Sequence, residues 1–175
     1  MALHIKKGKI MLKAIRILVI LATLIGSLWW FNAGISKTNA IRDNGTTILL
    51  KLRPVDPRAF MQGDFMALAY DYAAHLVKVP DMDPVGILIF AYDENNVAKF
   101  KRIGNIETLS KNEIRIKYAL ENRRISIGHA RYYFQEGTAK IYVGAKYGVF
   151  KVSEQGNMVL VGLADKEFVT LSAPN

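Results

Sequence analysis

The hydrophobic and polar positions divide the chain into one long apolar segment and a series of short alternating ones. Residues 17–35 (ILVILATLIGSLWWFNAGI) form a run of nineteen residues without a charge. About twenty apolar residues cross the hydrocarbon layer of a membrane as a helix. The aromatic residues 29–31 lie toward the end of this run, and amphipathic rings favour the interface between lipid and water. The pattern predicts a transmembrane helix over residues 17–35, in contact with the lipid bilayer.

After a polar juncture at residues 36–45, shorter apolar runs predict strands and hairpins. Residues 114–120 alternate between apolar and polar, which is typical of a strand with one face in the core and one in water. The polar residues 93–96 separate two apolar runs and predict a hairpin turn. The strands that we expect are 46–52, 65–70, 86–92, 97–103, 114–120, 124–131, 149–153 and 158–163. A short helix is expected near residues 138–147, with Gly148 as its cap.

These elements predict a mainly β fold. One N-terminal transmembrane helix precedes a mostly antiparallel barrel-like or sandwich-like domain, with about eight to ten strands and one short helix. The strands form a partly closed barrel or a two-sheet arrangement. The predicted segments are a basic N-terminus (1–16), an anchor (17–35), a juncture (36–45) and a β domain (46–175).

The positive charge of the chain is concentrated before the apolar run. The net charge is +9, and no acidic residue precedes Asp43. Basic residues beside a membrane span keep that side in the cytoplasm, so we expect a single-pass protein of the cytoplasmic (inner) membrane with an extracytoplasmic C-terminal domain. Because a topology signal explains the charge, no nucleic-acid partner is expected. The basic residues are Lys6, Lys7, Lys9, Lys13 and Arg16.

A cleaved signal peptide is the competing interpretation of the apolar run. Signal peptidase needs small residues at positions −3 and −1. Cleavage after Ala33 would place Phe31 at −3, and cleavage after Gly34 would place Asn32 there. The run is also longer than a usual signal core, so the sequence favours an uncleaved signal anchor.

Residues 52–72 (LRPVDPRAFMQGDFMALAYDY) combine a rigid turn with an apolar strand. Pro54 and Pro57 fix φ at two positions and remove two backbone donors. Gly63 and Asp64 then give a turn signal directly before the alternating run from Phe65. Both faces of that run are largely apolar, which predicts a strand buried on both sides.

This segment resembles the signature of the GDYXXLXY domain family. The matching residues are Gly63-Asp64-Phe65-Met66-Ala67-Leu68-Ala69-Tyr70, with phenylalanine in place of the family's tyrosine. The resemblance covers residues 45–165 and implies a membrane-anchored module. Genes of that family accompany those of multi-spanning membrane proteins, which implies a polytopic membrane partner. The motif residues, expected to have structural or binding roles, are Pro54, Asp56, Pro57, Arg58, Gly63, Asp64, Phe65, Leu68, Tyr70, Glu136 and Gly137.

The residue types present exclude several kinds of chemistry. The chain has no cysteine, so disulfides and thiolate sites are excluded. Neither His75 nor His129 has a ligand-type residue four positions later, and Asp81 and Asp83 alone do not form a calcium loop. We therefore expect no metal and no cofactor.

Two functional hypotheses remain. The favoured one is a non-enzymatic extracytoplasmic module of the cell envelope that binds a polytopic membrane protein. The alternative is a hydrolase, since two of the carboxylates of Asp56, Asp64 and Glu136 could together perform acid–base catalysis. Asp56 and Asp64 also suit turn positions, where their side chains accept backbone N–H bonds. The sequence favours this structural role for both residues.

Overall fold

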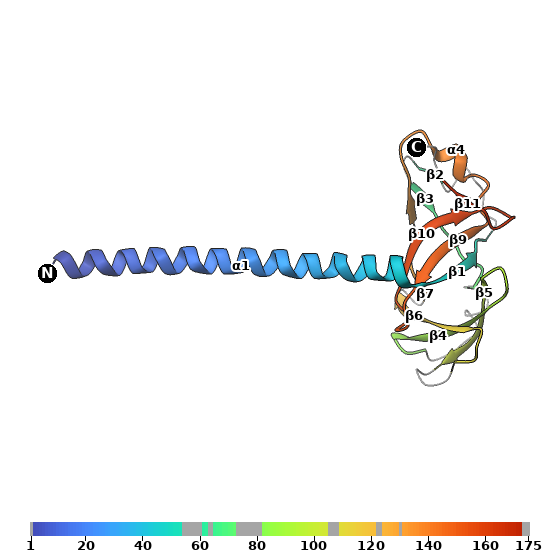
Figure 1. Cartoon of the computed structure of the whole chain (residues 1–175), viewed down its shortest axis with the longest axis horizontal. Helices are drawn as coiled ribbons and strands as arrows, with labels where there is room; N and C mark the ends of the chain where they lie inside the picture. Colours follow the sequence, from blue (N-terminus) through green and yellow to red (C-terminus); the bar gives the residue numbers. More distant parts are fainter. Residues whose placement is uncertain are drawn as a thin grey trace. The chain divides into compact units, whose positions relative to one another are not determined.

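The computed structural model describes residues 2–53, 61–62, 65–72, 82–104, 109–121, 124–129 and 131–172. The chain divides into two compact units, Met1–Asn39 and Ala40–Asn175, and each is considered by itself. We call the second unit the β domain. Figure 1 labels the helices and strands in chain order.

Helix α1 spans Ala2–Asn44 without interruption. Its segment Ile15–Asn44 is the one helix among the described residues that is long and apolar enough to cross a membrane. Two hydroxyls in its apolar part bond within the helix: those of Thr23 and Ser27 donate to the carbonyls of Val19 and Thr23 at 2.8 Å. These bonds satisfy the hydroxyl donors without water, as an apolar surrounding requires.

The polar juncture predicted after residue 35 is helical as far as Asn44. No proline or glycine lies between residues 35 and 44 to end the helix, whereas Gly45 follows at once. The backbone N–H of Gly45 donates to the carbonyl of Ile41 at 2.9 Å and closes the last turn. The boundary between anchor and juncture stays a prediction.

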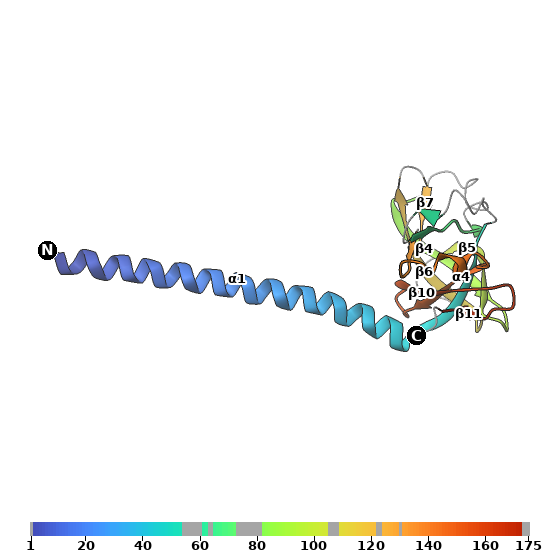
Figure 2. The same cartoon turned by 90° about the horizontal axis from the view of Figure 1, so that it is seen from above.

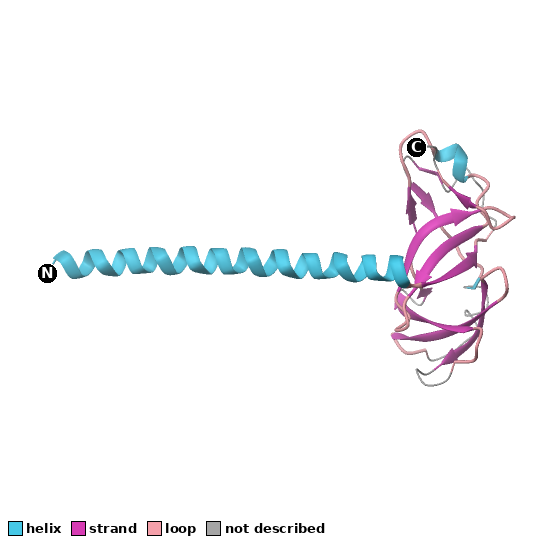
Figure 3. Ribbon diagram, viewed as in Figure 1, coloured by secondary structure: helices cyan, strands magenta, loops and turns pink. Residues whose placement is uncertain are grey.

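The β domain consists mostly of strands, drawn in magenta in Figure 3. Its larger sheet has eight strands in the order β11-β10-β9-β1-β5-β4-β6-β7. Every neighbouring pair is antiparallel except β1 and β5, which are parallel over two residue pairs. The strands are β1 (Thr46–Lys51), β4 (Val85–Tyr92), β5 (Val97–Gly104), β6 (Glu113–Glu121), β7 (Arg124–Ser126), β9 (Tyr147–Val152), β10 (Met158–Ala164) and β11 (Thr170–Leu171).

The three predicted hairpins are confirmed as β4–β5, β6–β7 and β9–β10. In the first, the Asp93 carboxylate accepts the backbone N–H groups of Asn95 and Val97, and Asn96 has a φ of 61°. Asparagine tolerates this left-handed conformation better than most residues. The polar turn signal in the sequence therefore corresponds to a closed, hydrogen-bonded turn.

A second sheet of three strands has the order β2-β3-β8, with β2 at Met61–Gln62, β3 at Phe65–Ala67 and β8 at Arg131–Tyr133. The prediction of one strand over residues 65–70, buried on both sides, is wrong. Strand β3 ends at Ala67 and its side chains are half-buried. Tyr70 forms an isolated bridge to Leu52 directly after β1. The first three residues of the alternating run thus belong to the small sheet, whereas Tyr70 pairs with Leu52 next to the large sheet.

The eight-stranded sheet is curved (Figure 1 and Figure 2). The main cluster of buried side chains draws on its strands β1, β4, β5, β6, β9 and β10. The curvature brings the β9–β10 turn to β6, where the N–H of Lys117 donates to the carbonyl of Gly156 at 2.9 Å. The largest fully buried side chains are Phe90 and Phe150. A smaller cluster of Leu49, Val97, Val149 and Ala164 is buried separately. The predicted mainly β, mostly antiparallel domain with one short helix is thus confirmed.

Two predicted element boundaries are wrong. The expected helix over 138–147 is the four-residue α4 (Ala139–Tyr142), because the N–H of Lys146 pairs with the carbonyl of Ala164 and starts β9. Gly148 therefore lies inside β9 rather than at a helix end. The strand expected to reach Arg131 ends at Ser126, and Gly128 turns the chain with a φ of 62°.

Candidate functional site

Six of the predicted motif residues lie outside the described residues. The structural and binding roles of these six residues, including the turn roles of Asp56 and Asp64, therefore stay predictions. His75 and Asp81 also lie outside the described part of the chain. The six residues are Pro54, Asp56, Pro57, Arg58, Gly63 and Asp64.

The end of the motif is tied to β1 and to the core. Leu68 and Tyr70 are both buried, and Tyr70 is only 5% exposed. The N–H of Arg53 donates to the carbonyl of Ala69, and the N–H of Asp71 donates to the carbonyl of Lys51. These bonds surround the Leu52–Tyr70 bridge. The motif tyrosine thus joins the small sheet to the large one.

Tyr70 and Tyr72 form a stacked pair with ring centroids 5.9 Å apart. The Tyr70 hydroxyl donates to the carbonyl of His129 at 2.8 Å, and the Tyr72 hydroxyl accepts the N–H of Ile127 at 3.3 Å. Burial raises the pKa of Tyr70 above its ordinary range, and burial raises the pKa of Tyr72 to about 12. Both phenols are therefore neutral at physiological pH and suit a structural role.

The other aromatic residue of the motif, Phe65, belongs to a surface that we call the aromatic ladder: Phe65, Arg131 and Tyr133. Phe65 pairs with Tyr133 across β3 and β8, with ring centroids 5.8 Å apart. The guanidinium carbon of Arg131 lies 5.3 Å from the centre of the Phe65 ring, a cation–π geometry. Tyr133 is 66% exposed.

The opposite face of the small sheet packs on the core. Met66 and Tyr132, which alternate with the ladder residues along β3 and β8, are partly buried against the main cluster. The ladder is therefore the outward face of the sheet. Sequence reasoning missed Arg131 and Tyr133, because the run before the short helix lacks a clear strand signal. The period-two placement of Arg131 and Tyr133 was the only available clue.

Glu136 and Gly137 form a turn before α4. Gly137 has a φ of 81°, and a Cβ there would meet no atom within 4 Å. The positive φ, and not a lack of room for a side chain, is therefore the reason that this position favours glycine. Glu136 is exposed, which suits a solvated turn residue.

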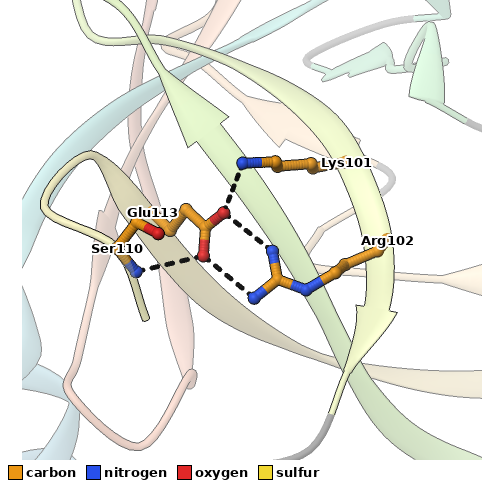
Figure 4. A network of polar contacts seen from close by, with 4 residues as sticks. All are labelled: Lys101, Arg102, Ser110 and Glu113. Atoms are coloured by element: carbon orange, nitrogen blue, oxygen red, sulfur yellow. Dashed lines mark hydrogen bonds and ion pairs between the residues drawn. The ribbon is translucent and has the colours of Figure 1, made fainter. Parts of the chain in front are cut away.

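A buried carboxylate that the sequence analysis did not identify lies at the start of β6 (Figure 4). Arg102 donates two hydrogen bonds to Glu113, at 2.7 and 3.0 Å, and the ammonium of Lys101 lies 2.7 Å from the same carboxylate. The backbone N–H of Ser110 donates at 3.1 Å. Arg102 first, then Lys101 and the Ser110 N–H, lower the pKa of Glu113 to about 2.

A β-bulge places both cations beside Glu113. The register of β4 and β5 shifts between Ile89 and Phe90, so Arg102 pairs with Ile89 and Lys101 is the extra residue. In a regular strand, adjacent side chains point to opposite faces. The bulge removes that alternation locally and lets Lys101 and Arg102 contact one carboxylate.

The β domain has two notable pockets. The first, of about 530 Å³, lies where the β1–β5 pairing ends after Leu50 and Ala98, and Lys51, Tyr72 and Lys99 contribute to its walls. The second, of about 320 Å³, lies between β6 and the β9–β10 turn, and we call it the hairpin pocket. Within the described residues, no group of three or more His, Asp and Glu side chains is placed to hold a metal ion.

Comparison with known families gives one match. The family model described as GDYXXLXY protein matches residues 28–163, which is most of the chain. This protein therefore belongs to the GDYXXLXY family, as the motif residues predicted. No curated protein and no solved structure matches the chain.

Proposed function

We propose that this protein is a single-pass, membrane-anchored module of the cell envelope that binds a polytopic membrane protein through the aromatic ladder. The observation that carries the proposal is the exposure of Tyr133 beside Phe65 and Arg131 on the outward face of a small sheet. Tyrosine and arginine are enriched among the residues that dominate binding energy at protein interfaces.

The charge of the ladder defines the chemistry of the partner. Arg131 contacts the Phe65 ring and has no ion pair among the described residues. A partner that supplies a carboxylate would complete a charge-assisted hydrogen bond at this position. Backbone pairing of β3 with β8 holds the three side chains in place before binding, which reduces the entropy lost on association. We therefore propose an acidic extracytoplasmic loop of the membrane protein as the occupant.

Anchoring and orientation rest on α1 and its flanks. The helix is long and apolar enough to cross a membrane. The basic residues before it favour a cytoplasmic N-terminus. The β domain is then extracytoplasmic, on the same side as the loops of an envelope partner.

The hydrolase alternative gains no support from the described residues. Of its three carboxylates, the structure describes Glu136, which is exposed in the turn before α4. Asp56 and Asp64 lie outside the described residues. The binding module is therefore the function that the geometry supports best.

Photocrosslinking in intact membranes tests the ladder. A photoreactive aromatic residue at position 133 should crosslink to an integral membrane protein with several spans. The same residue at Lys166, whose side chain is 80% exposed, serves as the control and should not. Arg131→Glu in the position-133 variant should abolish the product, because charge reversal places two carboxylates together. Identical products at positions 133 and 166, or crosslinks to lipid alone, would contradict the proposal.

Protease treatment of intact spheroplasts tests the orientation. A protease added outside should digest the chain beyond roughly residue 36 and leave a tag on the N-terminus intact, since the basic flank stays in the cytoplasm. Detergent lysis before treatment provides the control, in which the tag is also digested. Protection of the β domain in intact spheroplasts would show the orientation to be reversed.

A further inference from the structure

The hairpin pocket is a gap in the wall of the curved sheet. Its two sides are the edge of β6 that faces away from β4 and the turn between β9 and β10. Lys117 holds that turn in place: its N–H donates to the carbonyl of Gly156, and its ammonium donates to the Asn157 side chain at 3.2 Å. The pocket is therefore a built feature between two fixed elements.

Arg115 supplies a positive charge to one side of the pocket. Its Nε is buried without a hydrogen-bond partner, and its guanidinium has no ion pair among the described residues. Glu113, two residues earlier on the same face of β6, does not neutralise it. Arg102, Lys101 and the Ser110 N–H already occupy the Glu113 carboxylate.

Glu154 supplies a negative charge to the other side. It lies in the β9–β10 turn, is exposed, and forms no ion pair with Arg115 or with any other described residue. The rest of the lining includes the exposed apolar side chain of Leu109 and hydroxyls from Thr46 and Ser153. Within the described residues, the pocket thus presents Arg115 and Glu154 without ion pairs, together with apolar surface from Leu109.

We propose that the hairpin pocket binds a small zwitterion of the α-amino-acid type. Arg115 would receive the carboxylate, Glu154 would receive the ammonium group, and the ligand side chain would lie against Leu109. A dianion such as phosphate is disfavoured because Glu154 repels its second charge, and a simple amine is disfavoured because Arg115 repels it. The volume of about 320 Å³ lies at the small end of ligand sites, which suits a free amino acid.

This site is separate from the aromatic ladder, and its existence does not depend on the proposed partner. Its residues come from β6, the β9–β10 turn and the neighbouring ends of β1 and β4, whereas the ladder lies on β3 and β8. An extracytoplasmic domain with both features would bind a membrane partner on one surface and a small solute on another.

Calorimetric titration of the full chain in mild detergent tests the site, with the twenty free L-amino acids as probes. We expect saturable binding of at least one apolar amino acid, with leucine as the reference probe. Two analogues of leucine isolate the charges: 4-methylpentanoate lacks the ammonium group, and 3-methylbutylamine lacks the carboxylate. Each should bind about tenfold more weakly than leucine or worse, since each leaves one charged group unpaired. Failure of all twenty amino acids to bind would overturn the proposal, as would equal affinities for leucine and both analogues.

Matched variants assign the two charges. Arg115→Gln should abolish leucine binding, and Glu154→Gln should remove the preference for leucine over 4-methylpentanoate. Lys166→Gln and Glu167→Gln make the same changes at an exposed ion pair on a different turn and should leave binding unchanged. A thermal melt of each variant checks folding. Because Glu154 lies on an exposed turn, we expect Glu154→Gln to fold. This variant therefore still tests the proposal if Arg115→Gln fails to fold. Unchanged selectivity in Glu154→Gln would overturn the zwitterion assignment.

Discussion

Replacing Tyr70 with alanine should lower the free energy of unfolding of the β domain by about 3–5 kcal/mol, the range for truncating a large buried aromatic residue. Tyr70 stacks on Tyr72 and contacts Phe150 at a centroid distance of 5.7 Å. Its backbone bridges the motif to Leu52. The truncation would leave a cavity where the two sheets meet. Since typical domains are stable by about 5–15 kcal/mol, this is a large fraction of the total.

Tyr70→Phe separates the ring from the hydroxyl. It keeps the packing and removes only the hydrogen bond to the carbonyl of His129, so we expect a loss of about 0.5–1.5 kcal/mol. Urea denaturation of the full chain in mild detergent, followed by circular dichroism, measures both variants. Equal stability of Tyr70→Ala and wild type would mean that the motif tyrosine does not hold the sheets together.

Glu113→Gln should destabilise the domain at neutral pH and change its response to acid. The substitution keeps the shape of the side chain but removes the charge that Lys101 and Arg102 neutralise. The Lys101 and Arg102 side chains are 53% and 42% exposed, so water solvates them after the change. The loss comes from the charge-assisted hydrogen bonds that the buried carboxylate accepts from Arg102 and from the Ser110 N–H.

The acid response follows from the lowered pKa of Glu113, about 2 against an ordinary value of 4.5. Because the folded state favours the ionised carboxylate, its contribution is complete above about pH 4.5 and is lost as the pH falls toward 2. The melting temperatures of wild type and Glu113→Gln should therefore differ most at neutral pH and converge between pH 4.5 and 2. Glu167→Gln, at an exposed carboxylate, is the control and should stay close to wild type. Parallel curves for wild type and Glu113→Gln across this range would contradict the assigned role.

The local features of this protein follow from its sequence alone. The charge-free run predicts the apolar part of α1, since a helix with apolar side chains all round needs no information from distant residues. The β4–β5 hairpin was predicted because the polar residues 93–96 separate two apolar runs, and the structure shows a hydrogen-bonded turn there. The resemblance to the GDYXXLXY family likewise came from contiguous motif residues and is confirmed by the family match.

The candidate sites were predictable only in part. Phe65 and Tyr70 were identified from the motif. The motif did not predict that Phe65 would lie on the aromatic ladder and Tyr70 in the core. Arg131 and Tyr133 lie more than sixty residues from Phe65 in the sequence, and only strand pairing brings them together. The hairpin pocket likewise combines Arg115 on β6 with Glu154 on a later turn.

Tertiary structure decided the pairings between distant strands and the side chains that they bring together. The alternation of residues 65–70 predicts a strand, but the same period-two pattern is compatible with either sheet, and the structure divides the run between them. The bulge that directs both Lys101 and Arg102 toward Glu113 depends on the register of β5 against β4. Periodicity reports which faces of an element are apolar, whereas partner and register are set by packing and hydrogen bonding over the whole domain.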